Sequence, residues 1–408
     1  MFLRSLFAIF LLPLLVEAKT ILEPLDYVSD NLFYETEDGF FAIQAGGSAE
    51  ITGYYFNEAP IGFIFVQPGN HTQYHPRLTL EADAFVGERL SGSIKFRWDD
   101  GIDPGYMDNQ VRLDEIFADG VIVPGHLDLR VGRFATIFGN WVPRLDAWDN
   151  PFISPPLAYD QATSVSDLAV PANALSFASR RTANDSNFLK TWLPIIWGPV
   201  YTQGIAAFAS WGGFDLAVSG TNESLATRPS EWDDYDWTTP TFTGRLGYTH
   251  SAEWQFGLSG SIGSYFRPAA EPALPLGTDV GDYQQVVVGV DATWSSGPWQ
   301  VWGEFLFSQF DIPNVSDPAQ IFSYYIETKY KVTPQFYTAL RFGHQFYNEI
   351  DTILGSQNWE NDQIRAEVAL GYKFDRHSLF KVQYQFQHQF TSFQDGENQI
   401  AAQFVIKF

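Results

Sequence analysis

Apolar and polar residues alternate along most of the chain. Between residues 76 and 86 the polar positions are Arg77, Thr79, Glu81 and Asp83, with apolar residues between them. The last stretch, Gln399 to Phe408, alternates in the same way, with apolar residues at every even position from Ile400 onward. Successive side chains of a strand point to opposite faces, so each such stretch predicts a β-strand with one apolar and one polar face.

The pattern predicts sixteen strands. Their approximate ranges are 49–58, 76–86, 91–99, 110–118, 126–134, 201–210, 213–220, 240–249, 254–264, 283–294, 298–308, 320–331, 335–346, 362–374, 378–390 and 397–408. Two further stretches, Phe40 to Gln44 and Ala174 to Ser179, would give eighteen strands as an alternative.

The connections alternate between short and long. Short ones include 87–90, 211–212 and 333–334, whereas 59–75 and 221–239 are long. Transmembrane β-barrels have short turns on the periplasmic side and long loops outside. The sequence therefore predicts an all-β, antiparallel transmembrane β-barrel with both ends in the periplasm, closed by pairing of the last strand with the first near Ile51 to Tyr55. The alternative is a large soluble β-sandwich or two tandem ones, whose turn lengths need not alternate.

The beginning of the chain predicts a secretory signal peptide over residues 1–18. A charged start with Arg4 precedes an apolar run, Leu6 to Val16, and the small residue Ala18. That run is too short to cross a bilayer, and no later stretch supplies the roughly 18 apolar residues of a membrane helix. We expect residues 19–48 to form a short periplasmic segment and residues 49–408 to form the barrel.

The composition supports a membrane barrel whose interior contacts water. Aromatic residues make up 17% of the chain and cluster on the apolar faces at the short-turn ends, as expected of an interfacial girdle. These residues are Tyr248, Trp254, Trp294, Trp299, Tyr330, Phe336, Tyr372 and Phe380. The net charge of -24 argues against nucleic acid as a partner, and the lack of cysteine excludes thiolate metal sites and disulfides. The predicted location is the bacterial outer membrane.

The longest connection, residues 135–200 between strands 5 and 6, is rich in proline and aromatic residues. A loop of this length needs a functional reason, and we expect it to fold into the lumen and narrow it. The predicted pore-lining bases on the wall are Arg77, Lys95, Arg97, Arg112, Arg130 and Arg133, and the loop charges are Arg144, Asp146, Asp149, Asp160 and Asp167.

Two hypotheses fit these charges. Loop acids could oppose a basic wall and create a transverse field that selects polar solutes by size and charge. Alternatively, the wall bases could simply pair with neighbouring inward acids, namely Glu81, Asp83, Asp99 and Asp114.

Signals for catalysis and cofactors are weak. The chain has seven histidines but no metalloprotease, nucleophile-elbow or P-loop motif, so we expect neither an enzyme nor a bound cofactor or metal. A barrel phospholipase, which could assemble Ser and His from adjacent strands, remains an alternative. Acids in the outer connections, 99–108 and 231–236, could hold calcium or bridge lipopolysaccharide through divalent cations, or could form a solvated rim.

Three segments resemble known outer-membrane proteins. The last strand with its final Phe408 resembles the terminal strand of bacterial outer-membrane β-barrels, where that residue is part of an assembly signal. Leu129 to Gly139 resembles the strand-to-loop motif L-x-x-G-R-F-x-x-P-F-G of the phosphate-selective porin O and P family, with Ile137 in place of its proline. Tyr325 to Gln335 looks like that family's strand-turn-strand repeats.

The resemblance implies a sixteen-stranded trimeric channel with an arginine ladder and a lysine ring that guide oxyanions, and the bases from Arg77 to Arg133 could form a partial ladder. We carry over the fold and the channel role. The predicted function is passive diffusion of small hydrophilic solutes or ions through a homotrimer. The alternative is a structural barrel that sheathes a partner, such as an electron-carrying cytochrome, or anchors the envelope.

Overall fold

The computed structural model describes residues 25–27, 29–58, 63, 70–99, 110–182, 192–198, 200–228, 237–390 and 396–408. The predicted signal peptide and most of the acidic outer connections lie outside these residues. Sixteen strands form a closed antiparallel barrel with one extra strand, β1 (Phe33–Glu35).

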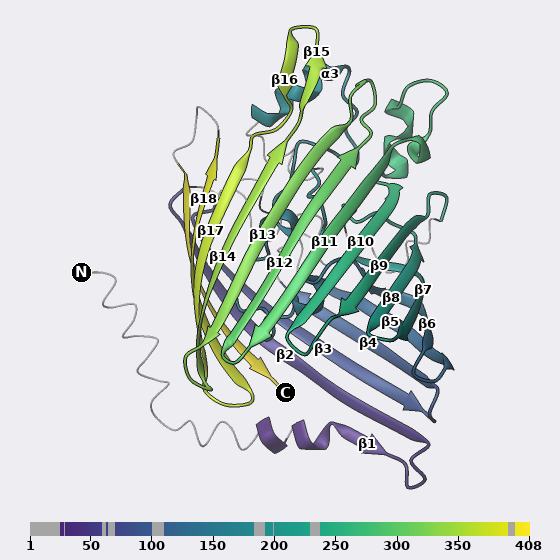
Figure 1. Ribbon diagram of the computed structural model, residues 1–408, viewed down its shortest axis with the longest axis vertical. Coiled ribbons are helices and arrows are strands. Elements are labelled where there is room, and N and C mark those ends of the chain that lie inside the picture. The colour runs from purple at the N-terminus through teal and green to yellow at the C-terminus, as the bar shows by residue number, and fades with distance from the viewer. Residues whose placement is uncertain are drawn as a thin grey trace, which may run out of the picture.

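The barrel strands follow the predicted pattern closely. They are β2 (Phe41–Phe56), β3 (Thr72–Val86), β4 (Leu90–Asp99), β5 (Gln110–Val123), β6 (Leu127–Ala135), β7 (Tyr201–Trp211), β8 (Phe214–Thr221), β9 (Thr241–Thr249), β10 (Trp254–Ser264), β11 (Gln284–Ser296), β12 (Trp299–Phe310), β13 (Ala319–Lys331), β14 (Phe336–Tyr347), β17 (Gln363–Lys373), β18 (Ser378–Gln389) and β19 (Glu397–Lys407). A small hairpin, β15 (Glu349–Thr352) with β16 (Gly355–Asn358), stands on an outer loop beside the helix α3 (Ala174–Ala178) (Figure 1).

The barrel closes where predicted. β19 pairs antiparallel with β2, with Phe404 opposite Ile51 and Ile400 opposite Tyr55. Beyond the end of β19, the backbone N–H of Gly47 donates to the carbonyl of Phe408 at 2.9 Å, and the N–H of Phe408 donates back to Gly47 at 3.0 Å. The first and last barrel strands therefore form the seam.

The alternative of eighteen strands is wrong. β2 begins at Phe41 rather than near residue 49, so Phe40 to Gln44 belongs mostly to the first strand, and its early part pairs with β1. The second stretch, from Ala174, forms the helix α3, because the side chain of Asn173 accepts a hydrogen bond from the Ser176 N–H in a capping box.

The two faces of the wall differ as the alternation predicts. Large apolar side chains point outward and are exposed, including Ile51, Leu80, Val290 and Ile326. Aromatic pairs lie at the short-turn ends: ring centroids are 4.6 Å apart in Phe214–Tyr248, 6.2 Å in Trp254–Trp294 and 4.5 Å in Trp299–Tyr330. The inward faces carry polar residues. This polarity is inverted relative to a soluble sandwich and suits a barrel surrounded by lipid.

Among the described residues, no helix is both long enough and apolar enough to cross a membrane.

The connection between β6 and β7 folds into the barrel, as predicted. Its described residues include three short 3-10 helices, η2 (Val142–Arg144), η3 (Leu157–Tyr159) and η4 (Ser179–Thr182), besides α3. Two further 3-10 helices, η5 (Pro268–Ala273) and η6 (Val280–Asp282), lie between β10 and β11. The aromatic residues of the connection between β6 and β7 form the main hydrophobic core together with inward residues of the wall such as Val287, Leu306 and Phe310. We call residues 136–200 the inner loop.

Candidate functional site

The inner loop is fastened to one side of the lumen, beginning at Gly139. This glycine has φ +69°, and a Cβ there would lie 2.5 Å from Oε1 of Glu304 on β12. Because Gly139 has no side chain, the backbone can approach the Glu304 carboxylate, which accepts hydrogen bonds from the N–H groups of Asn140 and Trp141. The hydroxyl of Tyr159 donates to the other oxygen of Glu304 at 2.7 Å. One inward carboxylate thus fixes two separate parts of the inner loop.

Arg341 on β14 holds the middle of the inner loop. Its Nη2 donates to the carbonyls of Ser154 (2.8 Å) and Pro155 (3.0 Å), and its guanidinium lies 4.2 Å from the centroid of the Phe152 ring. The same nitrogen donates to Glu367 on β17 at 2.7 Å. All of these groups are buried, so the hydrogen bonds must replace the water that the charges have lost.

Two neighbouring bases complete the attachment. Nη1 of Arg365 on β17 donates to the Asp160 carboxylate at 2.8 Å. Nζ of Lys381 on β18 donates to the carbonyls of Ala147 (2.7 Å) and Phe152 (2.9 Å). Strands β12, β13, β14, β17 and β18 therefore form a wall to which the inner loop is bonded, which we call the attachment wall.

At the outer end, the inner loop also packs against the connection between β16 and β17. Glu360 accepts hydrogen bonds from the N–H (2.8 Å) and hydroxyl (2.5 Å) of Ser164, and burial raises the pKa of Glu360 to about 6. Phe177 of α3 stacks on Trp359, with 5.4 Å between ring centroids. The outer end of the inner loop is therefore held in part by a buried carboxyl whose pKa is raised to about 6.

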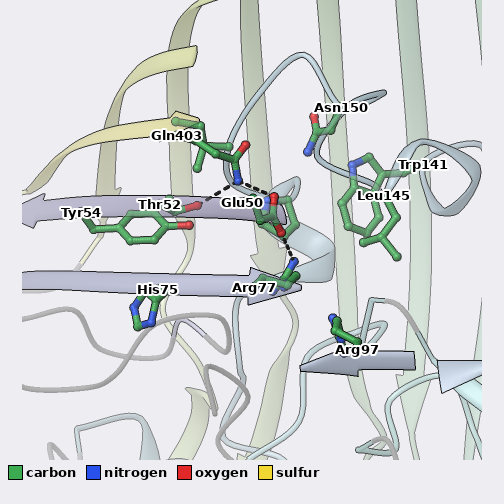
Figure 2. Close-up of a pocket in the computed structure, with 12 residues that line it drawn as sticks. Glu50, Thr52, Tyr54, His75, Arg77, Arg97, Trp141, Leu145, Asn150 and Gln403 are labelled. Atoms are coloured by element: carbon green, nitrogen blue, oxygen red, sulfur yellow. Dashed lines mark hydrogen bonds and ion pairs between the residues drawn. The ribbon is translucent and has the colours of Figure 1, made fainter. Parts of the chain in front are cut away.

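A cavity of about 50 Å³ remains between the inner loop and the opposite wall, which we call the gap (Figure 2). From the wall it is lined by Glu50, Thr52, Tyr54, His75, Arg77, Arg97 and Gln403, and from the inner loop by Trp141, Leu145, Asn150, Ile153 and Pro155. A second cavity of about 20 Å³ shares Glu50, Arg77, Arg97 and Leu145 with it and adds Lys95 and Asp146. Each water needs roughly 10–15 Å³ of such space, so the gap holds only a few waters.

The bases around the gap are all close to acids. Arg77 lies 3.2 Å from Glu50, which also accepts a 3.0 Å hydrogen bond from Gln403 (Figure 2). Arg97 lies 2.9 Å from Asp114. Lys95 reaches across the lumen to Asp146 of the inner loop at 3.1 Å. Both arrangements considered from the sequence therefore occur: Arg77 and Arg97 pair with acids of the wall, and Lys95 pairs with an acid of the inner loop.

The structure brings together four of the predicted site residues: Arg77 and Arg97 line both the gap and its neighbouring cavity, and Lys95 and Asp146 line the neighbouring cavity. The other wall bases lie elsewhere: Arg112 is beside Asp99, Arg130 is 2.8 Å from Asp119, and Arg133 is buried at the end of β6. On the inner loop, Arg144 lies 2.6 Å from Glu327 of the attachment wall, and Asp149 is exposed. Asp160 pairs with Arg365, and Asp167 pairs with Arg267 at 2.7 Å. The loop acids Asp160 and Asp167 therefore do not face the bases of β3 to β6; they pair with bases elsewhere in the barrel.

Sequence reasoning missed Glu304, Arg341, Glu367 and Lys381, which are the main attachment points of the inner loop. Each occupies a polar, inward position of its strand, which was the available signal. In the part of the chain that the structure describes, no group of three His, Cys, Asp or Glu side chains is arranged to hold a metal ion.

Comparison with known proteins gives likeness in structure but not in sequence. No protein-family model matches the chain, and no curated protein matches it. The outer membrane channel DcaP of Acinetobacter baumannii aligns with a TM-score of 0.57 and 11% identity over 92% of this chain and 99% of that one. An anion-selective porin from Comamonas acidovorans aligns with a TM-score of 0.56 and 10% identity over 90% and 100%. OmpT of Vibrio cholerae, in its trimer form, aligns with a TM-score of 0.55 and 10% identity over 90% and 99%. At this identity the likeness shows a shared barrel fold.

Proposed function

We propose that the protein is an outer-membrane porin, a water-filled channel for passive diffusion of small hydrophilic solutes or ions. The observation that carries the proposal is the gap, a cavity lined largely by polar residues between the inner loop and the wall of a closed barrel whose outer surface is apolar. Two of the structurally similar proteins are described as a channel and a porin, which supports this choice.

The inner loop is the constriction of this channel. It is bonded to β12, β13, β14, β17 and β18. The gap and its neighbouring cavity both lie on the side of β2 to β5. Arg77, Lys95, Arg97 and Asp146 line the passage, and Arg144 and Asp160 hold the loop. The small size of the gap limits passage to ions and small solutes.

Planar bilayers test the proposal. Purified protein added to a neutral bilayer should produce discrete conductance steps, and a double variant Leu145→Trp with Ile153→Trp, which fills the loop edge of the gap, should lower the step size while leaving folding intact. Heat-modifiable migration on gels checks that the variant still forms the barrel. A folded protein that never conducts would favour the alternative of a structural or partner-sheathing barrel.

The assembly and surroundings are further parts of the proposal. A homotrimer is supported by the trimer form of the similar V. cholerae protein, and the molecular mass of the protein in detergent would test it. Lipopolysaccharide contact through the outer connections and removal of residues 1–18 on export would be tested by lipid co-purification and by the N-terminal residue of the mature protein.

A further inference from the structure

The bases that line the gap are outnumbered by the acids around them. Arg77 lies 3.2 Å from Glu50 and 3.8 Å from Asp99. Arg97 lies 3.7 Å from the same Asp99 and 2.9 Å from Asp114. Asp99 is also the partner of Arg112, so one buried carboxylate serves three guanidinium groups.

Lys95 has three carboxylates near it. Its ammonium bonds to both oxygens of Asp146 at 3.1 Å. Its directly opposite neighbours on the adjacent strands are Glu81 and Glu115, close enough for cross-strand charge interaction. On β3 to β5, the four bases Arg77, Lys95, Arg97 and Arg112 thus have six acids as ion-pair partners or directly opposite neighbours, namely Glu50, Glu81, Asp99, Asp114, Glu115 and Asp146.

Two of these acids flank the passage itself. Glu50 lines both cavities from the wall, and Asp146 lines the second from the inner loop. The side chain of Asp146 is 56% exposed, so its carboxylate meets passing solute as well as Lys95. An anion entering the gap would have to compete with carboxylates already bound to each base, whereas a cation meets an excess of negative charge.

The attachment wall does not offset this excess. There the four bases Arg144, Arg341, Arg365 and Lys381 lie among the four acids Glu304, Glu327, Glu367 and Asp160. Further positive charge lies near the short turns, where Lys329 contacts the Tyr337 ring at 4.4 Å and Lys373 contacts the Trp148 ring of the inner loop at 4.6 Å. Neither lysine lines the gap or its neighbouring cavity.

We propose that the channel prefers small cations over anions, and that Glu50 and Asp146 are the residues that set this preference. The inference rests on the proposed channel function and concerns the same passage. It names a solute class opposite to that implied by the resemblance to the phosphate-selective family.

Reversal potentials under a KCl gradient across a neutral bilayer test the inference. The wild type should favour potassium, and the variants Glu50→Gln and Asp146→Asn should each lower the K⁺/Cl⁻ permeability ratio by up to about sevenfold, because one charge at ~7 Å in a water-like dielectric changes the energies of K⁺ and Cl⁻ by about RT each, in opposite directions. Asp351→Asn, in the exposed hairpin β15–β16, is the matched control and should leave the ratio unchanged. Replacing Lys329 and Lys373 by Gln should raise the K⁺/Cl⁻ permeability ratio.

The outcomes separate the two proposals. A wild type that conducts but favours chloride, or shows no preference, overturns the cation inference and leaves the channel function standing. A preference for potassium that survives both Glu50→Gln and Asp146→Asn overturns the assignment of these residues. A folded protein without any conductance overturns the channel function and this inference with it.

Discussion

Arg341 is the side chain on which the docking of the inner loop depends most. Replacing it by Met should leave the buried carboxylates of Glu327 and Glu367 without their shared partner, at a cost of about 3–5 kcal/mol. We expect the inner loop to detach intermittently and the single-channel current to become noisier and larger. Bilayer recordings measure both properties. Arg376→Met, at an exposed arginine in the short turn between β17 and β18, is the control; a quiet channel of unchanged size in Arg341→Met would contradict this role.

Glu360 should make the outer docking contact sensitive to pH. Its pKa is raised to about 6 by burial, so the docked state holds the proton more tightly than the released state, in which the carboxyl is hydrated. The resulting stabilisation is complete below the ordinary pKa of 4.5 and is lost as the pH rises through about 6. Protease cleavage of residues 164–182 should therefore be slower at acidic than at neutral pH. Glu360→Gln should remove the difference; an unaltered pH dependence would refute the assignment.

At the residue scale, sequence could predict which side chains face the lumen but not which ones meet. Alternation places Arg77, Lys95 and Arg97 on the inner face because strand geometry has a period of two. The partners of Asp160 depend on the path of the inner loop, which no period describes. That path is set by hydrogen bonds to Glu304, Arg341 and Lys381 far along the chain.

At the element scale, the seam between β2 and β19 depends on Gly47. A Cβ at this position would lie 2.4 Å from the carbonyl oxygen of Thr79 and 3.0 Å from the ring of Phe408. Gly47→Ala should force β2 away from β3 and the chain end, lowering barrel stability by about 1–3 kcal/mol. Gly53→Ala in the same strand is the control, since its Cβ would meet only the Tyr74 ring at 3.5 Å. The temperature at which the folded gel band disappears measures both; equal shifts would contradict the crowding argument.

The barrel strands were predictable because each satisfies two independent conditions, alternation along its length and a turn length set by the side of the membrane. Elements that satisfy neither were missed or misjudged. β1 is a short strand whose partner is the extension of β2 below the seam, and its residues are all exposed. Ala174 to Ala178 is helical because of a local capping box rather than a hydrophobic period.

At the scale of the whole molecule, the barrel and the inner loop are separable. The ring of strands is closed by backbone hydrogen bonds between neighbours alone. The inner loop contributes much of the main hydrophobic core and the proposed constriction, and none of its described residues forms a strand of the ring. Its two ends already meet, because the N–H of Thr136 donates to the carbonyl of Val200 at 2.9 Å.

Removing the inner loop should therefore widen the channel without opening the barrel. Residues 138–198 can be replaced by a short Gly-Ser turn, because the flanking strands β6 and β7 remain paired from Leu127 to Ala135. Single-channel conductance should rise severalfold and the potassium preference should fall, since Asp146 is lost and the lumen becomes wide and hydrated. The folded band should also melt earlier on heating, because apolar wall residues such as Leu306 and Phe310 would face water at about 25 cal/mol per Å². A deletion variant that is folded yet conducts no better than the wild type would show that the narrowest point lies elsewhere in the molecule.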